Sequence, residues 1–148
     1  MGTVTYPDAA VASYISRHFI PVQLNVVERP EVKERFHAHW TPTLILFDGD
    51  KVEYRRSEGY VDPKRCLGEL VLGRFKAALN GGRYQDLPAL AREALEITRG
   101  DAWREPEALY WNAIAAYRAT GDGKQLSDLW DIVIERFPKS DWGRKADI

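Results

Sequence analysis

The spacing of apolar positions in the first part of the chain changes from helical to alternating. Between residues 8 and 18, Val11, Tyr14 and their apolar neighbours recur at three- and four-residue intervals, which predicts a helix with one buried face. Over residues 21–27, Val22 and Leu24 alternate with polar side chains. A period of two with one polar face is typical of a strand near the edge of a sheet.

The next segment predicts a short helix followed by a hairpin. Residues 30–39 begin with proline and carry apolar residues at helical spacing, and residues 41–43, Thr-Pro-Thr, break that helix. Residues 44–47 are apolar without alternation, as in a strand covered on both faces. Residues 48–50, Asp-Gly-Asp, form a turn signal, and residues 51–56 alternate again. We therefore expect two antiparallel strands joined by this turn.

The rest of the chain keeps a helical period. Glycine-containing breaks and a Phe-Pro pair separate successive amphipathic segments. The sequence thus divides into an α/β domain, residues 1–80, and an all-helical region, residues 81–148, and we expect both to share one long helix. The predicted helices cover residues 63–80, 85–99, 106–120 and 126–137, with a short tail after Ser140.

Composition narrows the class of protein. The 148 residues are 45% hydrophobic and 29% charged, which is ordinary for a globular chain and excludes a disordered one. Apolar runs such as residues 43–47 are far too short to span a bilayer. The net charge of -1 gives no basic footprint, so neither nucleic acid nor a membrane is expected as a partner. The first residues lack the basic and apolar stretches of a signal peptide, so a cytoplasmic location is expected.

Three short motifs follow one another in the first half. Thr41-Pro42 directly precedes the apolar strand, Phe47-Asp48-Gly49-Asp50 forms the hairpin, and Gly59-Tyr60 precedes the long helix. With this order of elements, residues 1–80 resemble a thioredoxin-like domain. In that resemblance, Thr41 and Pro42 occupy the place of the family's cis-proline, which borders the redox pair and contacts an extended peptide. The alternative is that the two residues only form the turn that starts the strand.

The sequence departs from this family at its start. In thioredoxin-like domains, a strand and a Cys-x-x-Cys motif come just before the first helix, whereas this sequence begins at that helix. The segment from Met1 to Asp8 resembles the end of the stretch that follows the redox pair. Two alternatives stay open: the protein lacks the pair, or the start of this sequence lies inside a longer reading frame.

A missing strand would leave a gap in the sheet. In the thioredoxin-like order, that strand lies between the strands predicted at residues 22–26 and 44–47. Buried backbone groups without partners cost about 1–3 kcal/mol each, and a whole strand of them would exceed the stability of about 5–15 kcal/mol that a domain has. We therefore expect one of three outcomes: the two strands pair directly, another chain donates a strand, or upstream residues supply it.

The helical half resembles tetratricopeptide-type repeats. Tyr110, Ala113, Ile114 and Tyr117 match the spacing W-x2-L-G-x2-Y, and Pro138 lies where that repeat ends. Two units are fewer than a free-standing array needs, so their apolar faces should pack on the first half or on another chain. The resemblance implies an all-α tetratricopeptide-like region after an α/β thioredoxin-like fold with an incomplete sheet.

Aromatic residues of the helical half suggest a possible peptide groove, for which plain packing is the alternative. Repeat proteins bind peptides on a concave surface, and tryptophan and tyrosine are favoured anchors at interfaces. Trp111 lies beside the repeat face, so we expect it to be the more exposed residue. The candidate groove consists of Tyr110, Trp111, Ile114 and Tyr117.

No residues predict a metal, a cofactor or a nucleophile. His37 and His39 are two positions apart and point in different directions, and no cysteine or carboxylate cluster completes a zinc site. The single cysteine, Cys66, cannot run dithiol chemistry alone and is expected in the core. Asp48 and Asp50 fit the geometry of a turn, not acid–base catalysis.

These observations predict a non-catalytic thioredoxin-like protein-interaction module with a helical repeat tail. Its partner would be a protein or peptide, with a second copy of the chain, in a homodimer, as one candidate. The alternative is the remainder of a thiol–disulfide oxidoreductase whose Cys-x-x-Cys lies upstream of Met1. Enzymatic activity is expected only if those upstream cysteines exist.

Overall fold

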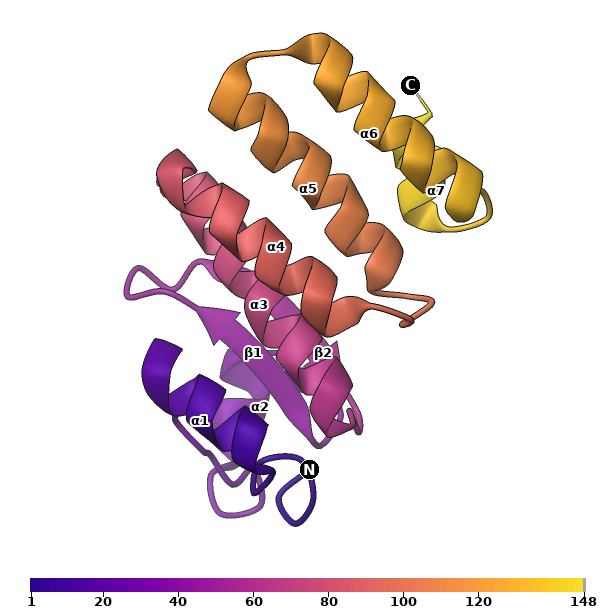
Figure 1. Ribbon diagram of the computed structural model, residues 1–148. Coiled ribbons are helices and arrows are strands. Elements are labelled where there is room, and N and C mark those ends of the chain that lie inside the picture. The colour runs from indigo at the N-terminus through magenta and orange to yellow at the C-terminus, as the bar shows by residue number, and fades with distance from the viewer. Residues whose placement is uncertain (148) are drawn as a thin grey trace. The chain divides into compact units, whose positions relative to one another are not determined.

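The computed structural model describes residues 1–147 and has a mixed α/β architecture. Over these residues, seven α-helices, one short 3-10 helix and a two-stranded antiparallel sheet follow one another along the chain (Figure 1). The chain divides into two compact units, Met1–Leu70 and a second that begins at Val71, with the boundary inside α3 (Pro63–Asn80).

The first unit begins with α1 (Ala9–His18). The Asp8 carboxylate accepts hydrogen bonds from the backbone N–H groups of Ala10, at 3.0 Å, and Val11, at 3.1 Å, and so caps the helix. Val11 and Tyr14 are buried on one face of the helix. The helix predicted at residues 8–18 is therefore confirmed.

The sheet of the first unit is a hairpin of β1 (Thr43–Phe47) and β2 (Glu53–Glu58). The Asp48 carboxylate closes the turn by accepting from the backbone N–H groups of Asp50, at 2.9 Å, and Val52, at 3.0 Å. The antiparallel hairpin is confirmed, although its second strand begins two residues later than expected.

The strand predicted at residues 21–27 does not form, and that prediction is wrong. Within the described residues, no backbone–backbone hydrogen bond involves the N–H or C=O groups of residues 20–24. Ile20 is 94% exposed and Val22 is 71% exposed. A strand needs a neighbour to pair its backbone groups, and here this segment has none. The direct pairing of residues 22–26 with β1, one of the three expected outcomes, does not occur.

The second helix, α2 (Pro30–Arg35), is shorter than the predicted residues 30–39. The chain leaves the helix because His37 adopts a left-handed backbone conformation with φ of 49°. Beyond this turn Ala38 is buried, as is Val32 within the helix.

The second unit holds the later turns of α3 and a series of helices that lie side by side (Figure 1). Its buried residues include Phe75, Leu87 and Ala115. Asp122 caps α6 (Gly123–Arg136) by accepting from the backbone N–H groups of Lys124 and Gln125. The predicted helical half is confirmed, with shifts of a few residues at its boundaries. The elements are η1 (Tyr84–Asp86), α4 (Leu87–Thr98), α5 (Glu105–Thr120), α6 (Gly123–Arg136) and α7 (Asp141–Ala146).

Candidate peptide-binding edge of the sheet

One edge of β1 is unpaired. The Pro42 carbonyl accepts from the Gly59 N–H at 2.8 Å, and antiparallel ladders alternate between bonded and non-bonded pairs. Leu44, opposite Ser57, and Leu46, opposite Arg55, therefore bond to β2. The backbone groups of the three alternate residues point away from β2, and the sheet has no other strand within the described residues. We call these groups the free edge: the N–H and C=O groups of Thr43, Ile45 and Phe47.

Thr41 and Pro42 lie directly before this free edge. Their peptide bond is cis, and Thr41 is exposed. The Thr43 hydroxyl donates to the Trp40 carbonyl at 2.5 Å, which fixes the turn that leads into β1. The structure thus places the first pair of predicted site residues at the start of an unpaired strand edge.

The first unit also exposes large apolar side chains. Phe47, at the end of β1, is 48% exposed and stacks on Phe36 with ring centroids 5.8 Å apart. Trp40, just before β1, is 69% exposed. Others in the same unit are Ile20, Val22 and Val27.

The outer edge of β2, unlike the free edge of β1, carries charged side chains. By the same alternation, the backbone groups of Arg56, opposite Ile45, and Glu58, opposite Thr43, point away from β1. The Arg56 guanidinium donates to the Glu53 carboxylate at 2.8 Å and lowers its pKa. Charged residues along an edge disfavour pairing with another strand. β1 has no charged side chain, so its free edge lacks this protection.

Cys66 lies in the core of the first unit. Burial, with smaller contributions from the carboxylates of Glu69 and Asp62, raises the pKa of its thiol to about 11. Burial also raises the pKa of Tyr6, with a smaller contribution from Cys66. A thiol with so high a pKa stays protonated at neutral pH and is a poor nucleophile.

The predicted groove residues on α5 lie mostly within an aromatic cluster. Tyr110 stacks on Trp130, with centroids 5.2 Å apart and planes at 16°. Trp111 contacts Phe75 and Trp142, with centroids 5.7 Å away in each case. Trp111 was expected to be the exposed residue, but its indole nitrogen is buried.

The other two groove candidates lie further along α5. Ile114 is half-buried, whereas Tyr117 is 38% exposed. The structure therefore brings Tyr110 and Trp111 together with Trp130 and Trp142 in a packed cluster, and it leaves Tyr117 as the most accessible of the four.

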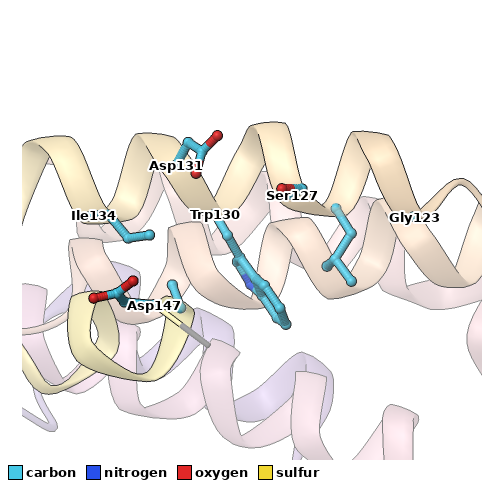
Figure 2. Close-up of a pocket in the computed structure, with 8 residues that line it drawn as sticks. Gly123, Ser127, Trp130, Asp131, Ile134 and Asp147 are labelled. Carbon is cyan, nitrogen blue, oxygen red and sulfur yellow. The ribbon is translucent and has the colours of Figure 1, made fainter.

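A small pocket between α6 and α7 adjoins this cluster. Its volume is about 330 Å³, and Trp130 reaches into it from α6 (Figure 2). The Trp130 indole N–H is buried without a hydrogen-bond partner. Asp131 lies on the other side of α6 in Figure 2, so the polar groups at the rim do not converge on one point. The pocket is lined by Gly123, Leu126, Ser127, Trp130, Asp131, Ile134, Ala146 and Asp147.

The described residues bring together no metal-binding group. No cluster of three or more histidine, cysteine, aspartate or glutamate side chains that could hold a metal ion occurs in residues 1–147. His37 and His39 are both exposed. In the same part of the chain, no helix is long and apolar enough to cross a membrane.

Sequence reasoning located the start of β1 but not its free edge. The gap expected in the sheet indicated that β1 would lack a neighbour, yet only the pairing pattern shows which three residues present their backbone groups.

Comparison with known proteins adds nothing to this assignment: no family model matches the chain, and no curated protein or solved structure matches it.

Proposed function

We propose that this chain is a non-catalytic thioredoxin-like protein-interaction module with a tetratricopeptide-like helical tail. The free edge of β1 carries the proposal, because three residues there offer unpaired backbone groups beside exposed aromatic side chains. Such an edge is a template for binding another polypeptide in extended form. The cytoplasmic location expected from the sequence belongs to the same proposal.

The state of the cysteine supports a non-catalytic role. Reduction of a disulfide by this chain would need a thiolate that can reach its substrate. Cys66 is fully buried, and its pKa is raised to about 11. The chain's own thiol therefore has neither the charge nor the access that the reaction needs.

Two measurements test the proposal. In the first, the full chain is added to insulin and dithiothreitol, and we expect the same rate of disulfide reduction as without protein. Acceleration that disappears in the Cys66→Ser variant would contradict the non-catalytic assignment. In the second, a displayed library of random peptides is selected on the immobilised chain, and we expect enrichment of peptides that bind it in solution. A library that yields no such peptide contradicts the interaction function.

A further inference from the structure

No further inference is drawn: the strongest candidate, the pocket between α6 and α7 beside Trp130, has polar groups at its rim that do not converge on one point, and nothing in the part of the chain that the structure describes shows what fills it.

Discussion

Arg55 and Glu69 form a buried ion pair in the first unit, with the guanidinium Nε 2.5 Å from the carboxylate Oε2. Their side chains are only 8% and 2% exposed. Arg55 comes from β2 and Glu69 from α3, so the pair ties the hairpin to the helix that follows it. A charge buried to this degree is tolerated when a partner compensates it.

Removing one partner of this pair should destabilise the protein strongly. We expect Arg55→Met to lower the free energy of unfolding by about 3–5 kcal/mol, because the Glu69 carboxylate stays buried without the charge of Arg55. The double variant Arg55→Met/Glu69→Leu should recover most of this loss. Urea unfolding followed by far-ultraviolet circular dichroism measures both. As a control, Lys124→Met breaks an exposed pair with Asp128 and should change stability by less than about 1 kcal/mol. Equal losses in Arg55→Met and Lys124→Met would contradict the role given to burial.

The buried thiol should make stability depend on pH in the alkaline range. The pKa of Cys66 is about 11 in the folded chain, against an ordinary value of 9.0. Between these values the unfolded chain loses the thiol proton while the folded chain keeps it, so the free energy of unfolding falls as pH rises. We expect wild type to lose about 1–3 kcal/mol more than Cys66→Ala between pH 9 and 11.

Tyr6 must be separated from this effect. Its pKa is also raised by burial, so it lowers stability with rising pH in the same direction. The Cys66→Ala variant keeps Tyr6 and the burial that is the larger cause of its shift, so the difference between the two unfolding curves reports the thiol together with its smaller effect on the pKa of Tyr6. Parallel curves for wild type and Cys66→Ala would show that the thiol titrates alike in the folded and unfolded chain.

The local elements could be predicted because their signals lie close together in the sequence. Asp8 stands directly before the first apolar face and caps α1, and the Asp48 turn lies between the two strands that it joins. The prediction of a strand around Val22 was wrong for a different reason. Alternation reports which side chains prefer burial, but a strand also needs a neighbour, and no local pattern shows whether one is present.

Long-range contacts could not be predicted in the same way. Arg55 and Glu69 are 14 residues apart and looked like ordinary charged positions. Trp111 was expected to be exposed because α5 was assumed to have one buried face. In the structure α5 packs against both α4 and α6, so residues on two sides of the helix are covered.

Because the indole N–H of Trp130 has no hydrogen-bond partner, two substitutions of this residue should differ sharply in their effect on stability. We expect Trp130→Phe to change the free energy of unfolding by less than about 1 kcal/mol, because the ring still packs and the removed N–H has no acceptor. Trp130→Ala removes the stacking on Tyr110 and should lose about 3–5 kcal/mol. Trp103→Phe, at an exposed position, is the control and should be neutral. A loss in Trp130→Phe as large as in Trp130→Ala would mean that the indole N–H is hydrogen-bonded in solution.

Gly143 and Gly123 offer a matched test of packing, because each lies in the first turn of its helix, α7 and α6 respectively. A Cβ at Gly143 would lie 2.2 Å from the Phe137 carbonyl oxygen, whereas a Cβ at Gly123 meets nothing within 4 Å. Gly143 also donates its N–H to the Ser140 hydroxyl that caps α7, so a displaced backbone would weaken that cap.

We therefore expect Gly143→Ala to lower the free energy of unfolding by about 1–3 kcal/mol or more, because backbone must move to admit the methyl group. Gly123→Ala should be neutral or stabilise by up to about 1 kcal/mol, since alanine favours the helix at the start of α6. Thermal and urea unfolding of the two variants measure the difference. If Gly143→Ala is as stable as Gly123→Ala, then α7 does not pack against the Phe137 carbonyl as described. The position of Ala146, which lines the pocket beside Trp130 from α7, would then also be wrong.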